Sequence, residues 1–126
     1  MIVQQIYEVL KKKDDWAITI WDVSGNVSLG CCNSSNAYSW DKVPEAVKYM
    51  TVEEIWPCSS SLYVKVTFES EAAYASEERC KMDGYEFLYH DPQRGPVYAK
   101  ETWMPNCYEG GAEFIGYTFS TIEGWC

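Results

Sequence analysis

A strict two-residue alternation across residues 61–69 constrains the fold of this chain more than any other feature of its sequence. The apolar set of this alternation is Leu62, Val64, Val66 and Phe68, and the intervening set is Tyr63, Lys65, Thr67 and Glu69. Successive side chains of a β-strand point to opposite faces, so the pattern predicts a strand with one face on a core and one toward solvent. The chain is therefore expected to contain a half-buried β-sheet.

An amphipathic helix is predicted for residues 2–13. Apolar side chains recur there at three- and four-residue spacing and form one stripe, made of Ile2, Val3, Ile6, Val9 and Leu10. Three consecutive lysines, 11–13, fall at the C-terminal end, where positive charge is favourable to the helix dipole. This basic cluster has a structural explanation, and it is weak evidence for nucleic-acid contact.

A β-hairpin is predicted for residues 16–22 and 27–32. Both runs are β-like, and Gly25-Asn26 between them suits a two-residue type II′ turn with glycine first. In that register Ile20 faces Cys31, which places Cys31 on the face of Ile20. Cys32 then lies on the opposite face, because adjacent strand residues alternate.

The segment before the alternating strand predicts one more helix and one more strand. A short helix is expected at residues 43–50, because Pro44 is well suited to a first helical turn. Residues 51–57 are β-like and are expected to pair with residues 61–69. The polar stretch at 33–36 separates these elements from the hairpin before them.

Residues 71–82 have a mixed pattern. They are rich in helix formers, Ser70 is a candidate cap, and Gly84 is a candidate end, so an exposed helix or helical turn is predicted. Three β-like runs then follow, separated by clusters of Gly, Pro and Asn. These runs are residues 85–90, 96–103 and 112–120.

Together these elements predict an α+β fold. We expect an antiparallel sheet of five to seven strands, with the N-terminal amphipathic helix packed on it and one or two short extra helices. The length of 126 residues is typical of one domain, so residues 1–126 are expected to form a single compact domain. No apolar run approaches the ~20 residues of a membrane span, and the N-terminal segment lacks signal-peptide features. A cytoplasmic protein without membrane partners is therefore predicted.

The charge balance indicates the kind of partner. The chain carries 19 acidic and 10 basic residues, for a net charge of −9, and 16% of its residues are aromatic. Acidic chains with few aromatics are usually disordered, whereas this chain has enough rings for a core and for its surface. An acidic surface repels phosphates, so direct nucleic-acid binding is not expected. It is complementary to a basic protein.

Six cysteines leave two interpretations open. They are Cys31, Cys32, Cys58, Cys80, Cys107 and Cys126. An even number suggests three disulfides if the protein is extracellular, whereas a reducing cytosol favours free thiols, which we expect here. Their spacing matches no zinc-finger or zinc-ribbon pattern, so no metal is predicted.

No catalytic residue or cofactor is predicted. The single histidine, His90, is followed directly by Asp91, which is too close in sequence to orient the ring as in a triad. Neighbouring carboxylates such as Glu53 and Glu54 diverge in a strand and are best explained as a solvated acidic surface. The glycines form no phosphate-binding pattern.

A partner-binding surface is predicted from acidic residues with tyrosines among them. Acidic side chains clearly outnumber basic ones across residues 69–91, the segment that core packing explains least. Tyrosines can anchor a basic partner through cation–π contacts. The candidates are Glu53, Glu54, Tyr63, Glu69, Glu77, Glu78, Tyr85, Glu86 and Asp91. Exposed aromatic rings are equally compatible with a second, smaller core or a homodimer interface.

The favoured function is that of a non-enzymatic acidic protein that inhibits or neutralises a basic, nucleic-acid-binding partner. In composition this is analogous to anti-CRISPR proteins and other DNA mimics, and to immunity proteins of toxin nucleases, although no residue motif matches either class. The alternative is a domain, or a small enzyme, that holds a nucleotide-like or sugar-like ligand in an aromatic-lined pocket. A disulfide-bonded extracellular domain is the third hypothesis.

Overall fold

The computed structural model describes residues 1–35, 38–59, 61–106 and 110–125. Within this part of the chain, eight strands form two four-stranded sheets, and the helices are short. The chain divides into two compact units, Met1–Phe68 (unit 1) and Glu69–Cys126 (unit 2), and each is described by itself. No helix in the described ranges is long and apolar enough to cross a membrane.

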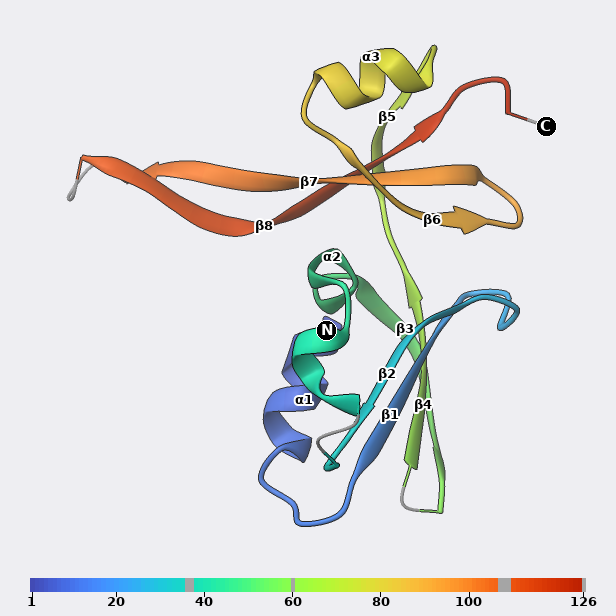
Figure 1. Ribbon diagram of the computed structural model, residues 1–126, viewed down its shortest axis with the longest axis vertical. Coiled ribbons are helices and arrows are strands. Elements are labelled where there is room, and N and C mark those ends of the chain that lie inside the picture. The colour runs from blue at the N-terminus through green and yellow to red at the C-terminus, as the bar shows by residue number, and fades with distance from the viewer. Residues whose placement is uncertain (36–37, 60, 107–109, 126) are drawn as a thin grey trace. The chain divides into compact units, whose positions relative to one another are not determined.

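Unit 1 is a mixed sheet with helices on one of its faces (Figure 1). Its strand order is β2-β1-β4-β3, in which β1 and β4 are parallel and the two outer pairs are antiparallel. The strands are β1 (Ala17–Asp22), β2 (Ser28–Asn33), β3 (Thr51–Cys58) and β4 (Ser61–Thr67). The helices are α1 (Val3–Leu10), the 3-10 turn η2 (Trp40–Lys42) and α2 (Glu45–Lys48).

The core of unit 1 confirms the alternation in the sequence. Val64 and Val66 of β4 are fully buried, and so is Ile20 of β1. Helix α1 contributes Val3 and Ile6 to the buried side chains, as its apolar stripe predicts. A backbone hydrogen bond from the Val3 N–H to the Met50 carbonyl, 3.3 Å long, ties the start of the helix to the short link between α2 and β3.

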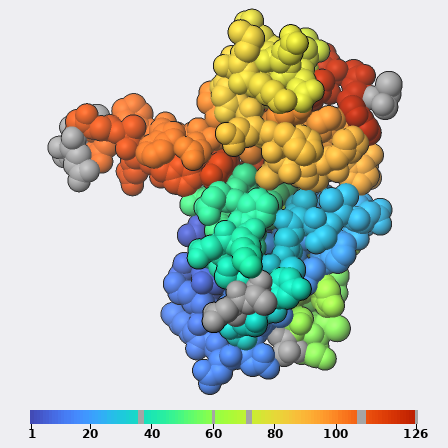
Figure 2. Space-filling model, viewed as in Figure 1, coloured from blue at the N-terminus to red at the C-terminus, as the bar shows by residue number. Residues whose placement is uncertain are grey.

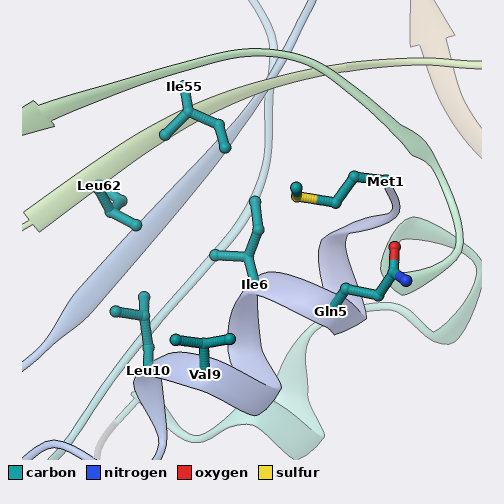
Figure 3. Close-up of a pocket in the computed structure, with 7 residues that line it drawn as sticks. All are labelled: Met1, Gln5, Ile6, Val9, Leu10, Ile55 and Leu62. Atoms are coloured by element: carbon teal, nitrogen blue, oxygen red, sulfur yellow. The ribbon is translucent and has the colours of Figure 1, made fainter.

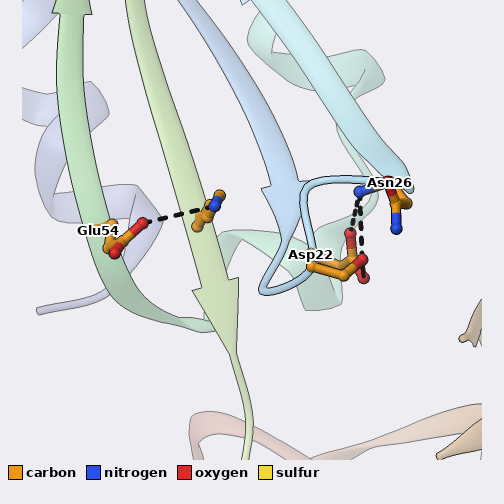
Figure 4. A network of polar contacts seen from close by, with 5 residues as sticks. Asp22, Asn26 and Glu54 are labelled. Carbon is orange, nitrogen blue, oxygen red and sulfur yellow. Dashed lines mark hydrogen bonds and ion pairs between the residues drawn. The ribbon is translucent and has the colours of Figure 1, made fainter. Parts of the chain in front are cut away.

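The loop between β1 and β2 differs from the two-residue turn that Gly25-Asn26 predicts. The Asp22 N–H donates to the Val27 carbonyl at 3.0 Å, so four residues lie between the paired positions. The Asp22 carboxylate, only 1% exposed, organises this loop (Figure 4). Its Oδ1 accepts from the N–H groups of Asn26 (3.1 Å) and Val27 (2.9 Å).

The longer loop and a bulge shift the hairpin register away from the prediction. Ile20 lies opposite Gly30, and Cys31 lies opposite Thr19. Cys32 therefore shares the core-facing side and is buried, whereas Cys31 is exposed. The predicted faces of the two cysteines are reversed.

Unit 2 is a second mixed sheet, with strand order β5-β8-β7-β6. Its strands are β5 (Ser70–Tyr74), β6 (Glu86–Asp91), β7 (Gly95–Asn106) and β8 (Gly111–Ile122), and its helix is α3 (Glu77–Met82). Strands β5 and β8 are parallel, and the other two pairs are antiparallel. Cys80 of α3 packs with Tyr85 and Tyr98 in a buried cluster.

The helix predicted at residues 71–82 is only partly correct. Its first part is strand β5, which pairs with the end of β8, so tertiary pairing overrides a modest helix propensity. The cap is Ser76 rather than Ser70, since the Ser76 hydroxyl accepts from the Arg79 N–H at 3.3 Å. Gly84 does end the helix, at a φ of 95° that favours glycine.

The α+β class, the N-terminal helix and the few short helices agree with the sequence prediction. The predicted single antiparallel sheet of five to seven strands is wrong, because eight strands of the described residues form two mixed sheets. Sequence alternation identifies a strand but not its neighbour, and here the neighbours β1–β4 and β5–β8 run parallel. That residues 1–126 form one domain stays a prediction.

Candidate interaction site

Strands β7 and β8 extend beyond both of their neighbours and form a two-stranded arm (Figure 1). Pairing of β6 with β7 covers residues 86–91 and 95–99, and pairing of β5 with β8 covers residues 119–122 on β8. Residues 100–106 and 111–118 therefore pair only with each other among the described residues. We call these two segments the arm.

The arm carries large apolar side chains in exposed positions. Trp103, Met104 and Ile115 are each more than half exposed, at 53%, 55% and 52%. In the space-filling view the arm forms a narrow ridge beyond the wider part of unit 2 (Figure 2). Soluble proteins rarely leave several large apolar side chains together in water without a use for them. The arm is thus the first candidate for an interaction surface.

One face of the arm is a row of aromatic rings. Trp103 lies opposite Phe114 in the register, with ring centroids 5.5 Å apart and planes at 64°. Phe114 meets Tyr117 edge to face at 5.5 Å. Glu101, opposite Tyr117, accepts a hydrogen bond from the Trp103 indole N–H at 3.2 Å. The row therefore has a carboxylate at its inner end.

A cavity of about 360 Å³ lies where the arm leaves the sheet; we call it the corner pocket. It is lined by Gly84, Glu86, Ala99, Lys100, Glu101, Trp103 and Tyr117. The pairs Glu86–Ala99 and Glu101–Tyr117 place both carboxylates on the sheet face that carries Trp103. The pocket thus combines two carboxylates with two aromatic rings.

Lys100 is the one basic residue that lines the corner pocket, and its amine lies over the ring of Tyr85. The Lys100 Nζ lies 5.5 Å from the centroid of Tyr85, which belongs to the buried cluster under α3. Lys100 also alternates with Ala99 and Glu101 along β7, so it starts from the opposite face of the strand. The Lys100 side chain thus lines the pocket while its amine lies near the Tyr85 ring.

Net charge is uneven between the units. Residues 1–68 contain six basic and eight acidic residues, whereas residues 69–126 contain four basic and eleven acidic ones. Unit 2 therefore accounts for seven of the nine net negative charges. Charges of one sign create a field that extends about a Debye length, so unit 2 attracts cations more than unit 1 does.

Helix α3 carries two of the predicted acidic residues. Glu77 and Glu78 lie in its first turn, where negative charge is favourable, and both are exposed. A hydrogen bond from the Tyr98 hydroxyl, followed by the ion pair with Lys81 (3.0 Å), holds the pKa of Glu77 below its ordinary value. Glu77 is therefore charged at neutral pH.

The structure does not bring all nine predicted residues together. Glu53, Glu54 and Tyr63 belong to unit 1, and the other six belong to unit 2. Glu54 forms an ion pair with Lys65 at 3.6 Å (Figure 4), and Tyr63 stacks on Trp56 at 5.7 Å.

In unit 2, Glu69, Glu77, Glu78 and Glu86 are exposed, and Glu86 lines the corner pocket. Tyr85 and Asp91 have structural positions and are buried. Tyr85 is 7% exposed and packs in the cluster under α3 rather than on a free surface.

Asp91, 6% exposed, organises the turn between β6 and β7. Its Oδ1 accepts from the N–H groups of Gln93 (2.8 Å) and Arg94 (2.9 Å), and its Oδ2 accepts from the Tyr89 hydroxyl (3.0 Å). The sequence alone does not distinguish a buried aspartate that organises a turn from an exposed aspartate on the surface.

A second hollow lies in unit 1, between α1 and the sheet (Figure 3). This groove of about 610 Å³ is lined by Met1, Gln5, Ile6, Val9, Leu10, Ile55 and Leu62. Its walls are aliphatic, with Val9 64% and Ile55 43% exposed. It has neither the aromatic rings nor the convergent polar groups that hold a sugar or a nucleotide.

The described residues contain no cluster of three or more His, Cys, Asp or Glu that could hold a metal ion. Four cysteines of this part of the chain are free thiols; Cys107 and Cys126 lie outside the described residues. Burial raises the pKa of Cys32 to about 11, so its thiol is not a nucleophile at neutral pH. His90 contacts the Trp125 ring edge to face at 5.0 Å.

Sequence reasoning selected Glu86 but not Glu101, Trp103 or Tyr117. A signal was present, because the β-like runs at 96–103 and 112–120 are both longer than the run at 85–90, which pairs with the first of them. Unequal strand lengths in a hairpin leave a two-stranded extension, where alternate side chains are not covered by a third strand.

Comparisons with known proteins add no further constraint. No protein-family model, no curated protein and no solved structure matches this chain.

Proposed function

We propose that this chain is a non-enzymatic binding protein that uses unit 2 to hold a basic partner. The observation that carries the proposal is the exposed aromatic arm on the unit that has seven of the nine net negative charges. An aromatic row supplies contact area at low entropic cost, and the surrounding charge selects a cationic surface.

The arm itself supports an interaction role. An isolated two-stranded ribbon is only marginally stable in water, so a chain gains little from one that stays unpartnered. A partner that covers Trp103 on one face of the ribbon, or Met104 and Ile115 on the other, removes apolar surface from water and stabilises the ribbon at the same time. Burial of the apolar side chains and ordering of the ribbon would therefore both favour binding.

The finer form of the proposal is inhibition of a nucleic-acid-binding protein, by a DNA-mimic or toxin-immunity mechanism. A channel that takes phosphates is lined by Lys and Arg, and an acidic unit competes for the same side chains. Long-range attraction accelerates the encounter and weakens as salt rises. The exposed Glu77 and Glu78 on α3 add charge beyond the arm.

Competition with DNA tests this proposal. A fluorescent DNA duplex is bound to protamine, an arginine-rich protein, and the chain is added at about 50 and about 300 mM NaCl. We expect release of the duplex at low salt and at least tenfold weaker competition, by order of magnitude, at high salt. Competition that does not change with salt contradicts the electrostatic mechanism.

A matched pair of charge variants shows which unit is responsible for the competition with DNA. The unit 2 variant replaces Glu77, Glu78 and Glu86 by glutamine, and the unit 1 control replaces Asp14, Asp15 and Asp41 by asparagine. All six are exposed, and both variants lose three negative charges. The unit 2 variant is expected to compete several-fold less well than the control. Equal losses would show that only total charge matters.

A small-ligand domain remains the second candidate, because the corner pocket has two aromatic walls and several polar groups. A thermal-shift screen of nucleotides and oligosaccharides tests it, since a bound ligand raises the melting temperature. A shift that is lost in the Trp103→Ala variant favours this candidate over a protein partner.

A further inference from the structure

The corner pocket lies beside an unpaired strand edge. The last pair between β6 and β7 is Glu86–Ala99, and β7 continues through residues 100–104 without a third strand on that side in the described part of the chain. Backbone N–H and C=O groups on such an edge are free to pair with an added strand. The pocket thus adjoins a strand edge with which an extended peptide can pair.

The lining of the pocket matches one side chain in particular. A guanidinium group is planar, stacks on aromatic faces and donates several hydrogen bonds in a fixed fork. Trp103 and Tyr117 offer the rings, and Glu86 and Glu101 offer carboxylate oxygens on the same face. A lysine amine matches this combination less well, because it is compact and strongly hydrated.

We infer that the corner pocket takes an arginine side chain from an extended segment of the basic partner. This inference rests on the proposed function and adds the residue type and its place. The segment runs along the free edge of β7, and its arginine lies between Trp103 and Tyr117 with its charge on Glu86 and Glu101. A sugar would use the rings but would gain nothing from the open strand edge.

Two further features of the pocket bear on how it would bind an arginine side chain. The Trp103 indole already donates to Glu101 at 3.2 Å, which fixes the ring and orients the carboxylate before any ligand arrives. Lys100 lines the pocket and is its only cation, although its amine lies near Tyr85. Removal of the Lys100 charge is therefore expected to strengthen binding of a cation.

The test is an NMR titration that follows the indole N–H of Trp103, assigned by its absence in Trp103→Phe. The probes are three short peptides that differ at one central residue, which is arginine, lysine or citrulline, together with cello-oligosaccharides. We expect the arginine peptide to shift this signal, the lysine peptide to bind about threefold to tenfold more weakly, and citrulline and the sugars to leave the signal unchanged. Equal shifts from arginine and citrulline, or a shift from the sugars, would overturn the inference.

Variants of the full chain complete the test. Glu101→Gln and Glu86→Gln are each expected to weaken the arginine peptide by about threefold to tenfold, and Lys100→Gln to strengthen it. Glu113→Gln is the matched control, because Glu113 is exposed on the same arm but does not line the pocket. Equal losses in Glu113→Gln and Glu101→Gln would contradict a specific site.

The result separates this inference from the proposed function. The chain could release DNA from protamine in a salt-dependent way while the Trp103 indole does not respond to the arginine peptide. That result would reject arginine binding in the corner pocket and would still support binding of a basic partner by unit 2. If protamine is not bound at all, the proposed function fails as well.

Discussion

Trp103 and Phe114 face each other across the arm, with ring centroids 5.5 Å apart and planes at 64°. This is the main cross-strand aromatic pair of a ribbon that no third strand supports among the described residues. Such pairs stabilise a hairpin by about 0.5–1.5 kcal/mol beyond the area they bury. The ribbon is therefore expected to depend on this pair for its order, as well as for contact with a partner.

Phe114→Ala is expected to loosen the arm without unfolding unit 2. Loss of the pair should speed amide hydrogen exchange at residues 100–106 and 111–118, by an amount that corresponds to about 1 kcal/mol. Exchange in the buried cluster of Cys80 and Tyr98 should stay unchanged. Met104→Ala is the control, because Met104 lies opposite Glu113 and outside the aromatic pair. A similar effect of both variants would contradict a special role of the ring pair.

Asp22→Ala is expected to destabilise unit 1 by about 1–3 kcal/mol, since the part-buried N–H groups of Asn26 and Val27 lose their charged acceptor. Asp22→Asn keeps one carbonyl oxygen for these groups and should cost about half as much. Urea unfolding measures both changes. If Asp22→Ala and Asp22→Asn are equally mild, the carboxylate does not organise the loop.

The same residue predicts a pH dependence. Burial by itself would raise the pKa of Asp22, but hydrogen bonds from Ser24, Val27 and Asn26 outweigh burial and lower it. The folded pKa lies below the ordinary value of 3.8, so this stabilisation is present above pH 3.8 and is lost as the pH falls further. The stability difference between wild type and Asp22→Asn should therefore shrink below that pH. A constant difference down to pH 2 would contradict the assignment.

Two tyrosines are expected to contribute stability that is lost at high pH rather than at low pH. The pKa of Tyr74 is raised to about 12, chiefly by its hydrogen bond to Asp83, and that of Tyr98 to about 12, chiefly by burial. Their contribution to stability is present below the ordinary pKa of 10.0 and is lost as the pH rises toward 12. Absorbance at the tyrosinate band should show these two groups titrating late, and Tyr74→Phe and Tyr98→Phe should each remove one late group. Titration of every tyrosine near pH 10 would refute this.

Gly95→Ala is expected to destabilise unit 2 more than Gly110→Ala. Both glycines have positive φ, 82° and 70°, so both substitutions carry a similar backbone cost. A Cβ at Gly95 would lie 2.4 Å from the Trp125 ring, whereas a Cβ at Gly110 meets nothing within 4 Å. Thermal unfolding should show the excess, and the Trp125→Ala background should remove it. An excess that persists in that background would mean that Trp125 is not the cause.

The cysteines should differ in reactivity according to burial. Burial raises the pKa values of Cys32 and Cys80, whereas Cys31 and Cys58 are exposed. Brief alkylation of the native protein, followed by peptide mass mapping, should label Cys31 and Cys58 well before the other two. Fast labelling of Cys32 would contradict the observed register of β1 and β2, which places it on the core side.

Local patterns predicted most elements of this fold. The alternation in β4 identified its buried residues, and the apolar stripe of α1 identified Val3 and Ile6. The β1–β2 register could not be predicted, because a side chain, Asp22, determines the loop length. The parallel pairs could not be predicted either, since strand order depends on contacts between distant segments.

The candidate site was less accessible to sequence reasoning. Glu86 was predicted, but the pocket exists because β6 ends its pairing at Ala99 while β7 and β8 continue. That juxtaposition joins residues from three strands that are separated in sequence by up to 31 positions, from Glu86 to Tyr117. Tyr85 and Asp91 show the converse problem, because an acidic or aromatic residue in a turn has the same sequence signature whether it is buried or exposed.

Titration of a nona-arginine peptide into the full chain, followed by amide chemical shifts, shows which unit holds a basic partner. We expect changes at Glu86 and at the amides of residues 99–104 and 111–118, which reverse when salt is added. Changes that instead concentrate on β3 and α1 of unit 1, or the absence of any change at low salt, would contradict the claim that unit 2 holds the basic partner.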